Sequence, residues 1–177
     1  MRVIAGTLGG RSFESPPGHK THPMSEKIRG AIFNMLGDIK GLYILDAFSG
    51  SGALAFEAVS RGAKKVIAVE LDTNAHKTIE TNIEALGVDN ITTSRANVGS
   101  WVKTNPKERF DIILCDPPYD RVNPELLESL AWYVKPGGVL VLSLPPKTRI
   151  ILPEDIFLPA SHKNYGDATL VFYRRLG

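Results

Sequence analysis

Four consecutive residues have the types needed to methylate an exocyclic amine on a nucleobase: Asp116, Pro117, Pro118 and Tyr119. Such an amine is a poor nucleophile because its lone pair is conjugated into the ring. A carboxylate at position 116 and the carbonyl of Pro117 could accept its two N–H bonds and free the lone pair. Proline suits this carbonyl because its φ is fixed and it has no competing N–H. Tyr119 offers a ring face on which an unstacked base could rest. The alternative is a simple turn that ends a strand.

A second group of residues, rich in glycine, could hold a nucleotide-like cofactor. The apolar segment 43–48 runs into a turn containing Gly50 and Gly52, and such turns let the backbone approach a ligand closely. The spacing Gly50-x-Gly52-x-x-Ala55, with Glu70 twenty residues after Gly50, also fits a dinucleotide fingerprint, so an NAD-dependent oxidoreductase is a competing interpretation. Asp46 opposes that interpretation, because a pyrophosphate would meet its negative charge. The sulfonium and ammonium of S-adenosylmethionine would be favoured there.

These residues must be positioned by a sheet, and the chain shows the pattern of one. Apolar runs alternate with helical segments, which predicts an α/β fold with a parallel sheet covered on both faces. A helix is expected from Ser25 to a stop at Gly37, and the last segment, 157–174, is expected to form a closing hairpin turned at 164–167. Strands are expected near 43–48, 65–70, 91–95, 110–115 and 138–144, and helices near 52–61, 73–86 and 124–134. Asn97 follows the third strand, where it either pairs with the N6 amino group of an adenine or is a surface turn residue.

The basic residues are concentrated at the front of the chain. Residues 1–40 hold six Lys and Arg against three acids, although the net charge of the whole chain is only +2. The first 14 residues alternate around a glycine corner and predict a hairpin, followed by a loop to residue 24. We expect this arm to contact RNA phosphates through Arg2, Arg11, Lys20 and Arg29. The alternative is an arm that only packs on the domain.

Length and composition indicate one globular domain. The chain has 177 residues, of which 43% are hydrophobic and 23% charged, as in ordinary soluble proteins. No signal-peptide pattern and no apolar run of about 18 residues is found, so we expect a cytoplasmic protein without membrane contact, and a monomer. The single cysteine, Cys115, excludes an intrachain disulfide and reads as a small buried hydrophobic residue. His19 and His22 lack further ligands, so no metal site is predicted.

Several motifs together resemble one family of RNA-modifying enzymes. They are Arg2-Val3-Ile4-Ala5-Gly6, the segment Arg29 to Leu36, Leu45-Asp46-Ala47-Phe48-Ser49-Gly50-Ser51-Gly52, Asp116-Pro117-Pro118-Tyr119 and Tyr165-Gly166-Asp167. The combination spans nearly the whole chain and is similar to the RsmD family of 16S ribosomal RNA guanine-N2 methyltransferases. The chain departs from the family at His22-Pro23-Met24, where Arg-Pro-Thr is usual, and at Asn97, where Asp is common.

The resemblance implies a class I S-adenosylmethionine-dependent methyltransferase fold, which is Rossmann-like. It implies a mostly parallel seven-stranded sheet with helices on both faces, preceded by a β-hairpin arm. Residues 1–24 would be the basic hairpin and loop of the same unit, and residues 25–177 the methyltransferase domain. Catalysis would lie at Asp116, Pro117, Pro118 and Tyr119. The cofactor would be held by Asp46, Phe48, Ser49, Gly50, Ser51, Gly52, Glu70, Leu71, Asn97 and Val98, and RNA by Arg2, Arg11, Lys20, His22, Arg29 and Tyr165.

Three classes of function therefore remain open from the sequence. The first is methyl transfer to a guanine of small-subunit ribosomal RNA, either naked or within an assembling subunit. The second is methylation of an amino group in DNA or protein by the same Asp-Pro-Pro-Tyr chemistry. The third is a non-catalytic nucleotide-binding or RNA-binding module. The two enzymatic classes make the same demand on the fold, which is that the corner at Asp116 and the glycine turn share one edge of the sheet.

Overall fold

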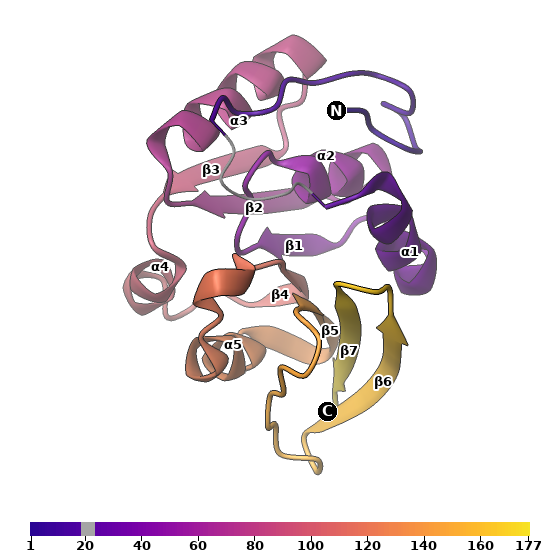
Figure 1. The fold of residues 1–177 in the computed structure, drawn as a ribbon, viewed down its shortest axis with the longest axis vertical. Helices are drawn as coiled ribbons and strands as arrows, with labels where there is room; N and C mark the ends of the chain where they lie inside the picture. The colour runs from indigo at the N-terminus through magenta and orange to yellow at the C-terminus, as the bar shows by residue number, and fades with distance from the viewer. Residues whose placement is uncertain (19–23) are drawn as a thin grey trace.

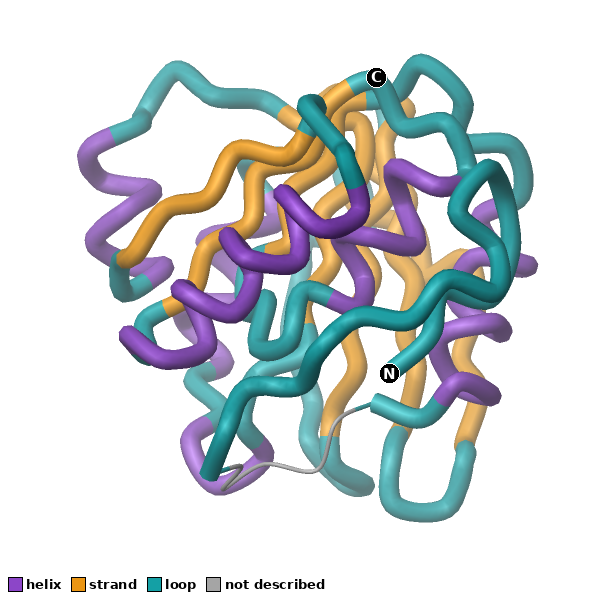
Figure 2. The backbone as a smooth tube through the Cα atoms, turned by 90° about the horizontal axis from the view of Figure 1, so that it is seen from above, coloured by secondary structure: helices purple, strands orange, loops and turns teal. Residues whose placement is uncertain are grey.

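The computed structural model describes residues 1–18 and 24–177, which form one seven-stranded sheet with helices on both faces (Figure 1, Figure 2). The strands lie in the order β3-β2-β1-β4-β5-β7-β6. They are β1 (Tyr43–Asp46), β2 (Lys65–Glu70), β3 (Ile91–Arg95), β4 (Phe110–Cys115), β5 (Val134–Leu144), β6 (Phe157–Asn164) and β7 (Thr169–Arg175). The helices are α1 (Glu26–Leu36), α2 (Ala53–Ser60), α3 (Thr73–Leu86), α4 (Val98–Thr104), α5 (Pro124–Ala131) and the 3₁₀ turn η1 (Tyr119–Arg121).

The sheet confirms the mostly parallel architecture expected from the alternating pattern. Strands β1 to β5 pair in parallel, and β7 pairs antiparallel with β5 and β6. Helices α1, α2 and α3 pack on one face in a core that contains Phe33, Phe56 and Ile79. Helices α4 and α5 pack on the other face around Trp101 and Leu130. Within the described ranges, no helix combines the length and apolarity needed to span a bilayer.

Most elements lie where the sequence predicts them, with differences at some ends. The capping residues Ser25 and Gly37 bound α1, and the final hairpin forms as β6 and β7. The short helix α4 was not predicted, because seven residues are too few to show a clear hydrophobic period. Strand β5 begins four residues earlier than expected. Its early part contains Pro136 and two glycines, and the β4–β5 register shifts there, which is typical of a β-bulge.

The N-terminal arm is a hairpin, as predicted, although it contains only one isolated antiparallel bridge, between Arg2 and Ser12. The N–H of Val3 donates to the carbonyl of Arg11 at 2.9 Å. Phe13 is buried against Phe56 of α2, with ring centroids 5.1 Å apart. The arm therefore packs on α2 rather than extending into solvent (Figure 1).

A buried carboxylate on α2 holds this arm in place. Glu57 is 0% exposed and accepts the N–H groups of Ile4 at 2.8 Å and Ala5 at 3.1 Å. It also pairs with Arg61 at 2.7 Å and with Arg29 of α1 at 3.7 Å. Arg29 donates in turn to the carbonyl of Arg2. A buried charge is tolerated only when it is paired and hydrogen-bonded, and Glu57 meets both conditions by binding the arm.

We predict that Glu57→Ala lowers the free energy of unfolding by about 3–5 kcal/mol, because it leaves a buried guanidinium and two arm N–H groups without their acceptor. Urea denaturation at pH 7 measures this loss. Glu26→Ala is the matched control, since it removes the exposed pair between Glu26 and Arg2 at 2.8 Å and should change stability far less. Equal losses in the two variants would contradict the role of the buried network.

Candidate active site

The parallel pairing of β1, β2 and β4 brings three carboxylates to one edge of the sheet. Asp46 at the end of β1 is in register with Leu114 of β4, two residues before Asp116. On the other side, Asp46 is in register with Ala68 of β2, two residues before Glu70. Because parallel strands end at a common edge, the glycine turn after β1 and the corner after β4 are neighbours. The geometric demand made by the sequence is met.

The glycine turn has two glycines with different roles. Both have a positive φ, 52° at Gly50 and 79° at Gly52. A Cβ added to Gly50 would meet nothing within 4 Å, whereas one added to Gly52 would lie 2.8 Å from the ring of Phe56. Gly52 therefore allows close packing at the start of α2, and Gly50 borders open space. The N–H of Gly50 donates to Glu70 at 2.6 Å, which fixes the turn against β2.

Asp46 is buried without a partner for its charge. The residue is 0% exposed, and neither carboxyl oxygen has a hydrogen-bond partner in the described part of the chain. The hydroxyl of Ser49 donates instead to the backbone carbonyl of Asp46, at 3.0 Å. Burial raises the pKa of Asp46 to about 8, with further contributions from the charges of Asp116 and Glu70. The free protein therefore holds Asp46 mainly protonated at pH 7.

The Asp-Pro-Pro-Tyr corner follows β4 directly. Burial raises the pKa of Asp116 to about 6, so the carboxylate is mostly ionised at pH 7 and can accept hydrogen bonds. Pro118, with φ −56°, leads into the turn η1, which begins at Tyr119. The Tyr119 side chain stays 40% exposed, so its ring is available for contact. The corner combines a half-buried acceptor with an accessible aromatic ring.

Ser143 is a site residue that the sequence analysis did not identify. Its hydroxyl lies 3.1 Å from the hydroxyl of Tyr119, and its hydrogen bond to Asp116 opposes the effect of burial on that pKa. Cys115 is in register with Leu142 on β5, so the next residues along, Asp116 and Ser143, are adjacent. In the sequence, this role was indicated only by a hydroxyl side chain near the end of the apolar strand expected at 138–144. Ser143 is only 2% exposed, so its interactions are with the protein.

The remaining predicted cofactor residues lie around this edge. Asn97 caps α4, and its Oδ1 accepts the N–H groups of Gly99 at 2.9 Å and Ser100 at 3.3 Å. This capping occupies the oxygen that was expected to accept from an adenine amino group, and it leaves the amide N–H groups for a ligand. Leu71 is 59% exposed beside Glu70. Phe48 is partly buried, and Ser49, Ser51 and Val98 are buried.

The structure corrects the predicted RNA contacts on the arm. Arg29 is 1% exposed and bound to Glu57, so the expectation that it contacts phosphate is wrong. Arg2 pairs with Glu26, and Arg11 donates to the carbonyls at the end of α3, at positions 85 and 86. Lys20 and His22 lie outside the described residues. Tyr165 lies in the β6–β7 turn, where its N–H donates to the carbonyl of Ala168 at 2.7 Å and its side chain is partly buried.

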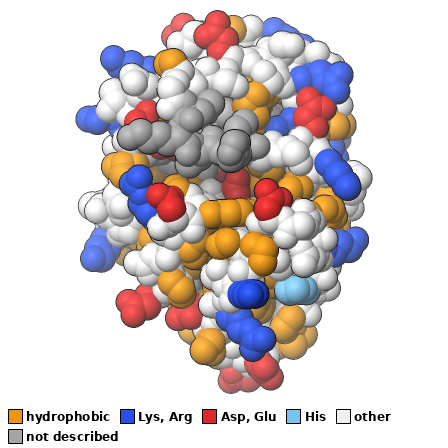
Figure 3. Space-filling view, in the orientation of Figure 1, with side chains coloured by type: hydrophobic (Ala, Val, Ile, Leu, Met, Phe, Trp, Pro, Cys, Tyr) orange, Lys and Arg blue, Asp and Glu red, His pale blue; other side chains and the backbone are white. Residues whose placement is uncertain are grey.

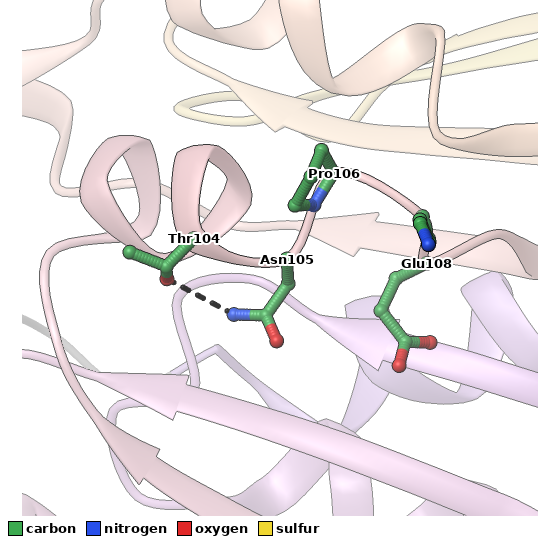
Figure 4. A pocket seen from close by; sticks show the side chains of 5 residues that line it. Thr104, Asn105, Pro106 and Glu108 are labelled. Carbon is green, nitrogen blue, oxygen red and sulfur yellow. Dashed lines mark hydrogen bonds between the residues drawn. The ribbon is translucent and has the colours of Figure 1, made fainter.

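Two further features do not belong to the site. A shallow pocket of about 430 Å³ lies between α4 and β4, lined by residues 104–108 (Figure 4). It precedes β4, at the edge opposite Asp116.

Cys115 is 2% exposed and burial raises the pKa of its thiol, which confirms it as a buried hydrophobic residue. In the ranges 1–18 and 24–177, no three His, Cys, Asp or Glu side chains are grouped to hold a metal ion.

Figure 3 shows apolar side chains at the centre of one face, with acidic side chains among and beside them. This is the face of Figure 1 on which η1 and the connection after β5 lie in front of the sheet. The surface there combines apolar contact area with negative charge. It suits a ligand that has a flat ring and a positive charge.

Comparison with known proteins gives consistent relationships along the whole chain. The family model described as Conserved hypothetical protein 95 matches residues 1–174. The ribosomal RNA small subunit methyltransferase D of Buchnera aphidicola (subsp. Acyrthosiphon pisum) is 33% identical over 160 residues, which cover 86% of this chain and 82% of that protein. The Escherichia coli protein of the same name is 31% identical over 150 residues, covering 81% and 74%.

Comparison of the fold with solved structures identifies relatives of the same kind. The solved structure of yhhF from Escherichia coli superposes with a TM-score of 0.84 at 25% identity, covering 100% of this chain and 98% of that one. With its family model, its curated relatives and its fold in agreement, the chain belongs to the RsmD family.

Proposed function

We propose that this chain transfers a methyl group from S-adenosylmethionine to the N2 amine of a guanine in small-subunit (16S) ribosomal RNA. The observation that carries the proposal is the adjacency of two features at one sheet edge. One is the glycine turn with its unpartnered buried Asp46, and the other is the corner from Asp116 to Tyr119. The names of the relatives, ribosomal RNA small subunit methyltransferase D, support the class of substrate.

The residues around the glycine turn fit S-adenosylmethionine. The two orphaned oxygens of Asp46 offer a carboxylate to a positively charged ligand, and Gly50 borders open space that a side chain would fill. Glu70 at the end of β2 is placed to hold ribose hydroxyls, as such acids do in related folds. Asn97 and Leu71 would border the adenine. When bound, S-adenosylmethionine supplies a methyl group carried by a cationic sulfur.

The chain's own contribution to the reaction is to orient and activate the amine. Asp116 accepts one N–H of the amine and the carbonyl of Pro117 accepts the other, so the lone pair turns away from the ring. The negative charge of Asp116 also stabilises the positive charge that develops on the nitrogen as the bond to the methyl carbon forms and the bond from that carbon to sulfur breaks. The methylated nitrogen then loses one proton to solvent. Tyr119 supports the base through its ring. Positioning of the two reactants accounts for a large part of the acceleration.

The Ser143 hydroxyl links the two halves of this corner. When Asp116 is ionised, Ser143 donates to it and accepts from the hydroxyl of Tyr119, so the tyrosine ring is held by the same chain of hydrogen bonds. The target guanine must be unpaired to reach the corner, in a loop or by being turned out of a helix. A domain of this size fits RNA organised by an assembling subunit.

Asp116→Ala is expected to lower methyl transfer at least tenfold while S-adenosylmethionine still binds. A charge-assisted hydrogen bond contributes about 1.5–3 kcal/mol, and about 1.4 kcal/mol corresponds to a factor of ten. Radiolabelled methyl transfer to small-subunit RNA, DNA and protein is the assay, with Asp120→Ala, an exposed acid on η1, as control. Labelling of DNA or protein alone would refute the RNA substrate, and near-normal turnover by Asp116→Ala would refute the catalytic assignment.

The pH dependence of kcat/KM for RNA, measured with S-adenosylmethionine at saturation so that Asp46 is already ionised, should report Asp116. Activity is expected to fall as the pH drops through about 6, because protonation removes the charge and one acceptor. Ser143→Ala should move this acid limb to higher pH, since it removes a hydrogen bond that favours the ionised carboxyl. Ser129→Ala, on the exposed side of α5, is the control. Superimposable profiles for wild type and Ser143→Ala would contradict the linkage.

Cofactor binding should release a proton from Asp46. Below pH 8 the free protein holds this carboxyl protonated, and a cationic ligand favours its ionised form, so affinity should rise between pH 6 and 8. Calorimetry at pH 7 in buffers of different ionisation enthalpy counts the protons released when S-adenosylmethionine binds. The release by wild type should exceed that by Asp46→Asn. An identical count in both proteins would exclude Asp46 as the source.

A further inference from the structure

The described arginines of the arm and of α1 have partners within the protein. The three described arginines expected to contact RNA are used within the fold. Arg29 is buried with Glu57, Arg2 pairs with Glu26, and Arg11 donates to backbone carbonyls of α3. An RNA substrate would need cations that lie near the catalytic corner and have no protein partner.

Three exposed cations without a partner among the described residues lie at or beyond the ends of β5 and β6, the strand ends on the same side of the sheet as Ser143. Lys147 and Arg149 follow the end of β5, and Lys163 lies near the end of β6. No ion pair or side-chain hydrogen bond involves any of the three within residues 1–18 and 24–177. We call these three residues the cationic rim. In Figure 3, Lys or Arg side chains lie over the lower part of the face, where Figure 1 draws β6.

The strand register places Lys163 in the same row as a site residue. Ser143 of β5 pairs with Leu170 of β7, and Leu170 pairs with Lys163 of β6. Residues paired across antiparallel strands project on the same face, so Ser143 and Lys163 share a face of the sheet. Neighbouring strands are about 4.8 Å apart, which puts the two backbones about 10 Å from each other. An extended lysine side chain is long enough to reach across much of the distance between the backbones of Lys163 and Ser143.

Lys147 and Arg149 lie in the connection after β5, and the backbone of this connection is restricted. Pro145 and Pro146 restrict the backbone, and Lys147 follows with a φ of 74°, the one non-glycine residue of the described chain with positive φ. A left-handed conformation costs such a residue roughly 1–2 kcal/mol, and strain of this kind is concentrated at functional sites. The connection is anchored beyond Arg149, because the N–H of Ile151 donates to Glu128 at 3.0 Å. The backbone on both sides of Lys147 and Arg149 is therefore restricted.

Among the acids near these cations in the sequence, one pair lies at the opposite edge of the sheet and another acid lies near Tyr119, while Glu128 is occupied by the N–H of Ile151. Glu154 and Asp155 precede β6, whose first residue pairs with Arg175 at the opposite edge of the sheet. Asp167, in the β6–β7 turn, contributes to raising the pKa of Tyr119, so this turn lies near the catalytic corner. The rim thus keeps a local positive charge next to an exposed aromatic ring. That combination is typical of surfaces that bind single-stranded nucleic acid.

We propose that the cationic rim, Lys147, Arg149 and Lys163, binds the phosphates that flank the target nucleotide while its base lies on Tyr119. The inference rests on the proposed function, and it names the surface that receives the RNA strand. A single strand is favoured over a duplex because the base must be unstacked to reach Asp116.

The test is the salt dependence of RNA binding. The triple variant Lys147→Gln, Arg149→Gln, Lys163→Gln is compared with wild type by fluorescence anisotropy, using a labelled fragment of small-subunit RNA over a range of KCl concentrations. Each lost phosphate contact should reduce the slope of log K against log[KCl] by about 0.7, so the triple variant should lose about 2. The control is Lys77→Gln, Lys103→Gln, Lys107→Gln, which removes the same charge from exposed positions on or after other helices.

The expected result is a reduced slope in the rim variant and a slope close to wild type in the control. An unchanged slope in the rim variant, or an equal reduction in both variants, would overturn the proposal. Thermal denaturation and S-adenosylmethionine binding verify that both variants are folded. Because RNA binding is measured without turnover, absence of methylation in wild type would count against the proposed function, whereas an unchanged slope would count against the rim alone.

Discussion

The parallel pairing of β1 with β4 is the constraint on which the site depends. β1 lies between β2 and β4, so the connections that leave β1 and β4 pass to opposite faces of the sheet, toward α2 and α5. A crevice opens at such a point because the two connections diverge. The register of Asp46 with Leu114 sets how far the glycine turn lies from Asp116. A shift by one residue would turn one of the two acids to the other face of the sheet.

The protein buries carboxylates in two contrasting ways. Glu57 is surrounded by two arginines and two backbone N–H groups, so its burial fixes the arm to α2 and α1. Asp46 is equally buried but lacks partners, and it is held protonated near pH 7. The first arrangement satisfies a charge within the fold and is structural. The second leaves a buried carboxyl group that a cationic ligand would stabilise, and such groups are common in binding sites.

The segment of the sequence that is richest in basic residues is not the one that supplies the cations without partners. The excess of basic residues in the first 40 positions suggested an RNA-binding arm, but burial and pairing use the described arginines of that arm within the fold. The cations left without partners near the site come from the region after β5, where acids are nearby in sequence. Strand register places Glu154 and Asp155, before β6, at the opposite edge of the sheet. The number of basic residues in a segment therefore says little about which of them meet a ligand.

The sequence by itself determined the alternating strands and helices, the caps of α1, the closing hairpin and the two motifs of the site. These features depend on local periodicity, turn residues and short-range chemistry, which one segment carries alone. The tertiary structure decided which acids meet, that Ser143 joins Asp116 to Tyr119, that Asn97 uses its oxygen as a helix cap, and that Arg29 is buried. Each of these depends on a partner that is distant in the chain or on burial, and neither property is encoded in the residues next to it.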